Sequence, residues 1–266
     1  MDIKTAHDKF YEMLVSIDEI CKKEKIRWFL EGGTELGAVR EHDFIAWDDD
    51  VDIKVFRRDY ERFKQALAKY LPENYKVVEP EDLSPAFYDY VTRIVDFDTP
   101  LHEDTEEDRY YGFCTNHFHI DVFIIDNAPD RVMLQKLHLF KFKFIYGLAL
   151  SKRYRIDYSN YKPLEVIMVK TCALIGSLFT TDQLLKKWRR EMTKYNKYRT
   201  GHKFFSNSMI LRGLNFYGSD LFRKSVRFPI RDRKFPVPAG YDKELTMHYG
   251  DYMTPVRDDN FYKPHF

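Results

Sequence analysis

The chain has 266 residues, of which 44% are hydrophobic and 17% aromatic, so it can build a sizeable core and is not intrinsically disordered. Its formal net charge of +1 indicates no bulk attraction to nucleic acid, and we predict no nucleic-acid partner. The three cysteines, Cys21, Cys114 and Cys172, are widely spaced without a CxxC pair, which argues against a disulfide framework and a structural zinc site.

The N-terminal part of the chain predicts a helix followed by a short strand. The first ten residues, MDIKTAHDKF, are charged from the second position and have no apolar signal core, so we expect a cytoplasmic location. Residues 4–24 have apolar side chains at helical spacing, which predicts an amphipathic helix against a sheet. The apolar run RWFLE (27–31) is typical of a short strand.

A glycine pair follows this strand and predicts a phosphate-binding turn. Gly32 and Gly33 let the backbone turn through angles that other residues avoid. Thr34 is a good N-cap for a helix over ELGAVRE (35–41), and N–H groups at a helix start bind anionic oxygen. Arg40 is a candidate to neutralise charge on a leaving nucleotide. It fits equally well as a solvent-exposed arginine at the helix end.

An acidic segment comes next and predicts a metal site. Residues 50–55 (DVDIKV) alternate with a period of two, as a half-buried strand does. Asp50 and Asp52 would then lie on one face with Cα atoms about 6.5–7 Å apart. Carboxylates at this spacing suit Mg²⁺, and Asp48 is a further candidate ligand. A solvated acidic loop is the plainer interpretation, but strand, GGT, helix and DxD in this order favour function.

The middle of the chain continues with predicted strands and one helix. Residues 57–71 read as a helix ended by Pro72, and short strands are expected at 75–79 and 91–97. The acidic stretch 101–109 is predicted to be a solvated loop, with a lid or acceptor contact as the alternative.

The segment HFHIDVFI (117–124) predicts a second strand with a polar face. His117, His119 and Asp121 share this face. If the strand lies beside the aspartate strand, Asp121 adds a third carboxylate to the same metals. The alternatives are an ion pair of Asp121 with a neighbouring Arg or Lys, and an ordinary structural hydrogen bond for His119.

The sequence from 131 to 199 is helical in pattern and rich in basic and aromatic residues. The apolar run 166–179 is interrupted by Lys170 and falls short of the ~20 residues that a membrane span needs, so we expect a buried helix there. A surface in peripheral contact with a membrane is the alternative. Further on, RFPIRDRKFPVP predicts two short strands, and residues 241–249 a helix ended by Gly250.

Three segments together resemble one protein family. LEGGTELGAVREHDFIAWDDDVDI (30–53) resembles the signature of the LicD family of phosphotransferases, which is related to fukutin-type enzymes and more distantly to the nucleotidyltransferase superfold. HFHIDVFIIDNAP (117–129) and FPVPAGYDKELTMHYGDYMTPV (235–256) are similar to later segments of that family. Three residues stand where the family commonly has glycine, proline and glutamate: Asp43, Ala46 and Arg231.

The resemblance implies an α+β fold, with a nucleotidyltransferase-like mixed sheet flanked by helices and a helical, basic-aromatic insertion. We expect a catalytic core over 1–130, a helical region over 131–225 and a C-terminal element over 226–266. The implied activity is metal-dependent transfer of a phospho-substituent, phosphocholine in the first instance. The implied donor is a CDP-alcohol, and the implied acceptor is a hydroxyl of a glycan, a lipid-linked glycan or a teichoic-acid precursor.

The candidate site combines the residues above. Asp50, Asp52 and Asp121 are the predicted catalytic residues and ligands of two Mg²⁺ ions, with Mn²⁺ as the alternative metal and Asp48 as an additional ligand. The predicted accessory residue is His119, and the predicted donor-phosphate residues are Gly32, Gly33, Thr34 and Arg40. Two other functions stay open: a nucleotidyltransferase that moves NMP, and a non-catalytic module that binds metal or nucleotide in surface-glycan assembly.

Overall fold

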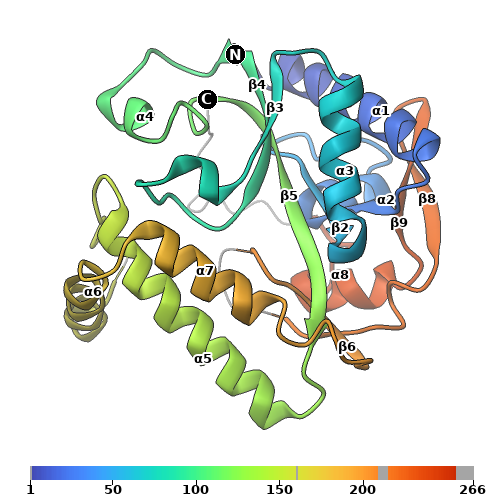
Figure 1. The fold of residues 1–266 in the computed structure, drawn as a ribbon. Helices are drawn as coiled ribbons and strands as arrows, with labels where there is room; N and C mark the ends of the chain where they lie inside the picture. Colours follow the sequence, from blue (N-terminus) through green and yellow to red (C-terminus); the bar gives the residue numbers. More distant parts are fainter. Residues whose placement is uncertain (1, 160, 209–214, 256–266) are drawn as a thin grey trace.

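The computed structural model describes residues 2–159, 161–208 and 215–255, and a mixed β-sheet with helices around it forms its centre (Figure 1). The strands run in the order β1-β2-β5-β4-β3, with β6 beside β5 and β7 beside β6. These strands are β1 (Trp28–Leu30), β2 (Asp52–Phe56), β3 (Tyr75–Val78), β4 (Thr92–Pro100), β5 (His117–Ala128), β6 (His202–Phe205) and β7 (Tyr217–Gly218). The pair β2–β5 is parallel and the other pairs are antiparallel, which confirms the predicted fold class.

Eight α-helices and a separate two-stranded hairpin complete the described part of the chain. The helices are α1 (Ile3–Lys23), α2 (Gly32–Arg40), α3 (Arg57–Tyr70), α4 (Glu106–Tyr110), α5 (Val132–Ala149), α6 (Pro163–Gly176), α7 (Thr181–Met192) and α8 (Tyr241–Tyr249). The hairpin strands are β8 (Ser225–Ile230) and β9 (Arg233–Pro238), and two 3₁₀ turns are η1 (Pro80–Leu83) and η2 (Leu150–Lys152).

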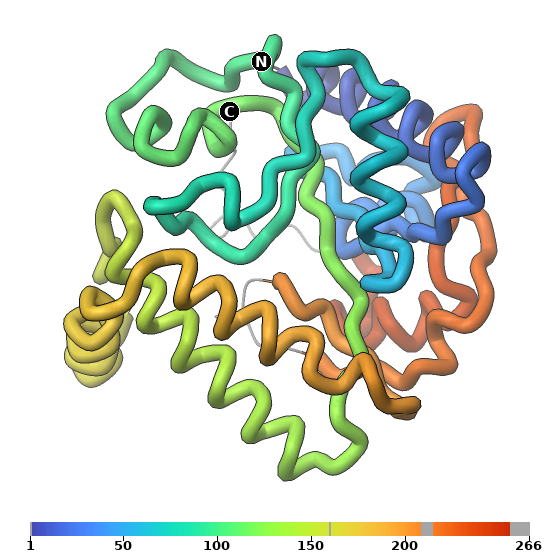
Figure 2. Tube along the Cα trace, viewed as in Figure 1, coloured from blue at the N-terminus to red at the C-terminus, as the bar shows by residue number. Residues whose placement is uncertain are grey.

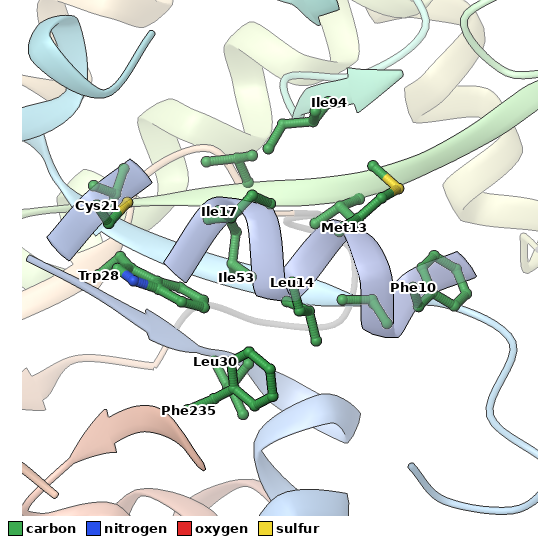
Figure 3. Close-up of a cluster of buried hydrophobic side chains, with 14 of the residues drawn as sticks. Phe10, Met13, Leu14, Ile17, Cys21, Trp28, Leu30, Ile53, Ile94 and Phe235 are labelled. Carbon is green, nitrogen blue, oxygen red and sulfur yellow. The ribbon is translucent and has the colours of Figure 1, made fainter. Parts of the chain in front are cut away.

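Helices α1 and α3 cover one face of the sheet and bury its main core. The apolar stripe of α1 packs on Ile53 and Val55 of β2 and on the alternate residues of β5. Phe235 of the hairpin closes the same cluster beside Trp28 (Figure 3). Because side chains alternate along a strand, this burial fixes which β2 residues point the other way. Asp52 and Lys54 belong to that opposite face.

A second helical layer lies against the far part of the sheet. Helices α5 and α7 pack side by side, and β6 then returns to pair with the end of β5 (Figure 2). Trp188 of α7 stacks on Tyr90, with ring centroids 3.4 Å apart. The sheet therefore continues past residue 131, and the predicted division of the chain at 130 and 225 stays a prediction.

Two expectations about local structure are wrong. The acidic stretch predicted as a loop contains the five-residue helix α4, because Thr105 and Asp108 form a reciprocal capping box that starts it. The aspartate strand begins at Asp52 rather than at Asp50. Asp50 is exposed in the preceding loop, so the two acids do not alternate along one strand.

The expectation of a buried helix over residues 166–179 is also wrong. Of the residues of α6, Gly176 alone is buried, because the helix packs on α5 and η2 at the edge of the molecule (Figure 1). Within the described residues, no single helix is long and apolar enough to cross a membrane. By length and composition one pair, α6 with α7, passes that test together, but it is bent by 111°.

Candidate functional site

The glycine turn brings the start of α2 against two aspartates. Gly32 opens the helix with a positive φ of 55°, a conformation that side chains disfavour. A Cβ on Gly33 would collide with the carboxylate of Asp48, and one on Gly32 would lie 3.1 Å from Asp52 Oδ2. Only residues without a side chain therefore let both carboxylates approach the first turn of the helix.

Thr34 does not have the predicted role of helix cap. The helix begins three residues earlier with Glu31 as the N-cap residue, because Gly32 already turns the chain. The Thr34 hydroxyl instead accepts a hydrogen bond of 3.0 Å from the N–H of Asp52. Thr34 thus ties the helix start to the first residue of β2.

The aspartates form what we call the open carboxylate group, which consists of Asp48, Asp50, Asp52 and Asp121. Burial is the main cause that raises the pKa of Asp48 to about 8. The negative charge of Asp50 and a hydrogen bond between the Asp48 and Asp50 side chains raise it further. Burial also raises the pKa of Asp52 well above its usual value, and the charges of Asp50 and Asp121 add to the shift. This mutual repulsion shows that the four side chains lie close enough to act on one another.

Asp121 enters this group through sheet pairing. Asp52 and Asp121 are register partners on the parallel strands β2 and β5, and the Asp121 N–H donates to Val51 O at 3.0 Å. The predicted adjacency of the two strands is thus confirmed. Neighbouring register partners point their side chains to the same face of a sheet, so Asp52 and Asp121 sit beside one another.

Arg93 on β4 also contacts Asp121, so the alternative of an ion pair is realised as well. Its Nε lies 3.2 Å from Asp121 Oδ1, while its two terminal nitrogens hold Asp89 at 3.0 and 2.7 Å. Asp121 and Asp89 raise the pKa of Arg93 well above its usual value against the opposing effect of burial. His119 Nε2 lies 3.7 Å from the same Asp121 oxygen. Sequence reasoning missed Arg93.

These residues carry the type of ligand atom, the carboxylate oxygen, that a hard divalent cation takes. Such a cation also displaces the protons that crowded carboxyl groups retain. Asp48 and Asp50 share a hydrogen bond that requires one of the two to be protonated. Asp121 Oδ1 is buried and makes no hydrogen bond among the described residues, although it is ion-paired with Arg93 Nε at 3.2 Å. The donor set is thus incomplete as a hydrogen-bond network.

A second acidic cluster lies on the same face of the sheet, around Lys54, which is two residues after Asp52 on β2. We call it the lysine cage, and it consists of Lys54, Glu31, Glu35 and Glu244. The three glutamates place oxygens within 4.8 Å of one another, which is the spacing of a metal site. The ammonium of Lys54 fills that space, at 2.6 Å from each carboxylate. The cage therefore holds a built-in cation and is not a candidate for metal binding.

The charges in the lysine cage determine its protonation. Burial lowers the pKa of Lys54, but the three glutamates together raise it well above its usual value. Burial raises the pKa of Glu244 to about 7, and it raises that of Glu35 still further above its usual range. Three carboxylates against one ammonium leave surplus negative charge, so the cage retains protons near neutral pH. Sequence reasoning missed this cluster, although a lysine in an apolar strand is an unusual residue there.

Helix α8 contributes Tyr249 to the glycine turn. A Cβ on Gly32 would lie 3.7 Å from the Tyr249 hydroxyl. Burial of the hydroxyl raises its pKa, and Glu31, Asp52, Asp48 and Asp50 raise it further. The phenol therefore stays protonated and can donate a hydrogen bond. Tyr249 lies in the C-terminal segment that resembles the LicD family, and this resemblance was the sequence signal that could have found it. His265 from the same tail lies outside the described residues.

The structure does not bring Arg40 to the glycine turn. Arg40 is the last residue of α2, about 12 Å along the axis from Gly32 at 1.5 Å per residue. Its side chain pairs with Glu41 at 2.6 Å and donates to Tyr252 O at 2.9 Å. The contact of Arg40 with donor phosphate stays a prediction, and the helix carries Arg40 away from the aspartates.

Two of the residues that depart from the family pattern contact each other. Arg231 Nε lies 3.7 Å from Asp43 Oδ1, and its NH1 atom lies 2.7 Å from Asp8 Oδ1 of α1. Arg231 N–H also donates to His42 O at 3.2 Å. Arg231 thus connects the hairpin to the loop that precedes the aspartates. Arg231 and Asp43, two of the residues that differ from the family pattern, stabilise this loop together.

Comparison with known proteins shows a similarity to the LicD family. Residues 25–146 match the family model described as "LicD/FKTN/FKRP, nucleotidyltransferase domain". Over 260 residues the chain is 26% identical to lipopolysaccharide cholinephosphotransferase LicD of Haemophilus influenzae, a match that covers 92% of this chain and 89% of that protein. The chain is therefore similar to the LicD family over its N-terminal half and to the Haemophilus protein over most of its length.

The LicD match covers the part of the chain that carries the site. Its range of 25–146 includes the glycine turn, Asp52 and Asp121, and the Haemophilus relative matches nearly the whole chain. Two uncharacterized proteins, from Rickettsia typhi and Rickettsia prowazekii, are each 34% identical over 67 residues, which is 25% of this chain and 22% and 25% of theirs. The likeness to LicD thus rests on the domain model and on the long match.

Proposed function

We propose that this LicD-like enzyme transfers a phospho-substituent, phosphocholine in the first instance, from a CDP-activated donor to a hydroxyl of a cell-surface glycan or teichoic-acid-type acceptor. The family is one of transferases of phosphate-containing groups, and the Haemophilus relative is named for cholinephosphotransfer to lipopolysaccharide. The observation that carries the proposal is the register pair Asp52–Asp121 beside the glycine turn. The proposal includes a cytoplasmic location, where a nucleotide-activated donor is expected.

Divalent cations, Mg²⁺ or Mn²⁺, belong to the proposal. Asp52 and Asp121 would hold them with Asp50, and Asp48 would complete the donor set. When bound, the cations neutralise phosphate charge and orient the reacting oxygens. The first-turn N–H groups of Gly33 and Thr34 are placed to donate to a donor phosphate, since a helix N-terminus favours anions. The Tyr249 hydroxyl adds a further donor at the same point.

Asp121 is the residue best placed to accept the proton of the acceptor hydroxyl. Its side chain is partly exposed and lies 3.2 Å from the Arg93 guanidinium, which orients the carboxylate. His119 lies beside it and is placed to orient the acceptor or to pass the proton on. Arg93 does not contact the reacting atoms in this assignment and acts as a positioning residue.

Product analysis tests this function. The purified chain is incubated with CDP-choline, Mg²⁺ and a glycan acceptor such as lipopolysaccharide, and the products are examined by mass spectrometry. CMP together with a phosphocholine-substituted glycan is the expected result. Pyrophosphate together with an NMP adduct from a nucleoside triphosphate would instead support a nucleotidyltransferase. Binding of CDP-choline without turnover on glycan, lipid-linked or teichoic-acid acceptors would support a non-catalytic module.

The donor alcohol can be selected in a separate screen. Choline, ethanolamine, ribitol and glycerol derivatives of CDP share the nucleotide and the diphosphate, so they differ only where the alcohol contacts the protein. Thermal shifts with and without Mg²⁺ should be largest for the true donor, because a ligand that binds only the folded chain stabilises it by RT ln(1 + [L]/Kd), which grows as Kd falls. A metal-independent shift, equal for all four, would contradict binding through the open carboxylate group.

A further inference from the structure

The two helices at the edge of the molecule leave large apolar side chains exposed to solvent. Met133 and Phe140 of α5 are 81% and 65% exposed, and Leu164 and Leu174 of α6 are 70% and 73% exposed. We call this surface the α5–α6 apolar face: Met133, Leu137, Phe140, Phe144, Leu164, Ile167, Met168, Leu174, Ile175 and Leu178. An apolar surface of this size is unusual for a chain that contacts only water, and it indicates an interaction site.

The way α6 packs explains why its large side chains face outward. Gly147 of α5 meets Cys172, and Gly176 lies so close to Leu148 that a Cβ would collide with the Leu148 backbone. Small residues therefore line the contact between the two helices, which leaves the larger residues on the far side. Leu164, Ile167, Leu174 and Leu178 are separated by three, seven and four residues, so they share that far side.

The charged residues of α5 itself are all basic, and one of them, Lys141, is paired with Glu191 at 3.7 Å. Residues 131–156 contain seven basic residues and no Asp or Glu: Arg131, Lys136, Lys141, Lys143, Lys152, Arg153 and Arg155. At helical spacing, Lys136 and Lys143 lie on one side of the row formed by Met133, Leu137, Phe140 and Phe144, and Lys141 lies on the other side. Apolar residues bordered by basic ones are the pattern of a helix that lies on an anionic lipid surface.

We propose that the α5–α6 apolar face docks the protein onto the surface of a bilayer that contains anionic phospholipid. Helix α6 is about 21 Å long at 1.5 Å per residue, against ~30 Å for the apolar part of a bilayer, so it lies on the membrane rather than spanning it. Helix α7 is held in the protein by Leu184, Leu185 and Trp188 and does not extend α6. This docking goes beyond the proposed transfer and does not depend on it.

A second copy of the chain fits this face less well than lipid does. A twofold dimer places the same patch of both copies in contact, so the basic residues of α5 would face their own equivalents. Anionic headgroups provide the opposite charge, and acyl chains accept the apolar side chains. The lysine stems can bury their methylenes while the ammonium groups stay in the headgroup layer.

Vesicle co-sedimentation of the full chain tests the inference. Vesicles of phosphatidylcholine alone are compared with vesicles that also contain phosphatidylglycerol, at low and high salt. The chain is expected to sediment with the anionic vesicles, less so at high salt. The double variant Met168→Ser with Leu174→Ser should weaken binding about tenfold. Replacing Lys136 and Lys143 by Glu should weaken it by about fivefold or more for each residue.

Matched variants elsewhere on the surface serve as controls. Val226→Ser removes an exposed apolar side chain from the hairpin, and Lys4→Glu with Lys234→Glu reverses two exposed charges away from α5. Both controls should bind vesicles like the parent chain. All variants should keep the parent's melting temperature and its transfer to a water-soluble acceptor, so failure to dock is distinguishable from failure of the proposed function.

Three outcomes would overturn the inference. The parent chain could remain in the supernatant with both kinds of vesicle. The variant with Met168→Ser and Leu174→Ser could bind as tightly as the parent. The chain could form a dimer, by light scattering, that this variant dissolves while neither protein binds vesicles. The last result would assign the face to a second copy.

Discussion

The open carboxylate group and the lysine cage are both clusters of acidic side chains, and they differ in that the lysine cage contains the ammonium of Lys54. Asp52 and Lys54 are two residues apart on β2, and both project to the face opposite the α1–α3 core. In the cage, the Lys54 ammonium lies 2.6 Å from three glutamates. In the open group, burial and mutual repulsion raise the pKa values of Asp48 and Asp52. The comparison teaches that a fixed cation offsets the repulsion within a carboxylate cluster, whereas in the open group the fixed cation Arg93 contacts Asp121 and the raised pKa values remain.

The largest expected difference between the two clusters is in catalysis. Asp52→Asn keeps the size of the side chain and removes a carboxylate of the open group. We expect kcat/KM for phosphocholine transfer to fall by about 10³-fold or more, equal to ~4 kcal/mol of transition-state stabilisation. Asp98→Asn on the exposed end of β4 is the matched control and should retain activity. Full activity of Asp52→Asn under metal saturation would contradict the mechanism.

The lysine cage should respond in stability. Lys54→Met leaves three buried glutamates without their cation, and breaking a buried ion pair by removing one partner costs about 3–5 kcal/mol. Urea unfolding measures the loss. Glu35→Gln is the informative counterpart, because it removes surplus negative charge while Lys54 keeps two partners. It should be neutral or stabilising at pH 8. Equal stability of Lys54→Met and the parent chain would show that the cage does not hold the fold.

A smaller effect is expected from Tyr249, which belongs to neither cluster and touches the glycine turn between them. Tyr249→Phe removes one hydrogen-bond donor, so kcat/KM should fall about tenfold, equal to ~1.4 kcal/mol. Tyr198→Phe is a control at an exposed position. If Tyr249→Phe lowered stability and left kinetics unchanged, the hydroxyl would have only a packing role.

How far the sequence predicts these features depends on how local each one is. The alternation in 117–124 and the apolar residues of β2 predicted two strands, because a period of two is a local signal. The pairing of these strands, which brings Asp121 near Asp52, was a hypothesis that the register confirms. The lysine cage escaped prediction because Glu244 is 190 residues from Lys54 along the chain. Arg93 escaped for a similar reason, since its contact with Asp121 depends on the register of β4 against β5.

Other expectations failed where tertiary structure overrides a local rule. Thr34 has the right chemistry for a helix cap, but the positive φ of Gly32 starts α2 earlier. Helix α6 is apolar enough for a core, but small residues at its contact with α5 turn the large side chains outward.

The smallest expected effect is the dependence of stability on pH. A carboxyl group whose pKa is raised in the folded state stabilises the fold while it is protonated, and this contribution is lost as the pH rises through the folded pKa. The pKa is about 7 for Glu244 and about 8 for Asp48. The metal-free chain should therefore lose stability between pH 7 and pH 8.5. His138 and His248, whose pKa values burial lowers, are neutral in both states across this window.

Thermal unfolding at fixed ionic strength measures this dependence. Asp48→Asn should raise the melting temperature at pH 8.5 by about 2–4 °C, which corresponds to ~1 kcal/mol for a chain of this size. Mg²⁺ should reduce the loss in the parent chain, because it replaces the protons of the open carboxylate group. A melting temperature that rises from pH 7 to pH 8.5 without metal would have the wrong sign.

The position of a bound metal distinguishes the two clusters. Crystals grown with Mn²⁺ and CDP-choline allow the ion to be located by its anomalous scattering, independently of activity. We predict Mn²⁺ at about 2.0–2.2 Å from carboxylate oxygens of Asp52 and Asp121, with Lys54 still bound to its three glutamates. A manganese peak among Glu31, Glu35 and Glu244, or none beside Asp52 and Asp121 with the nucleotide bound, would contradict the assignment.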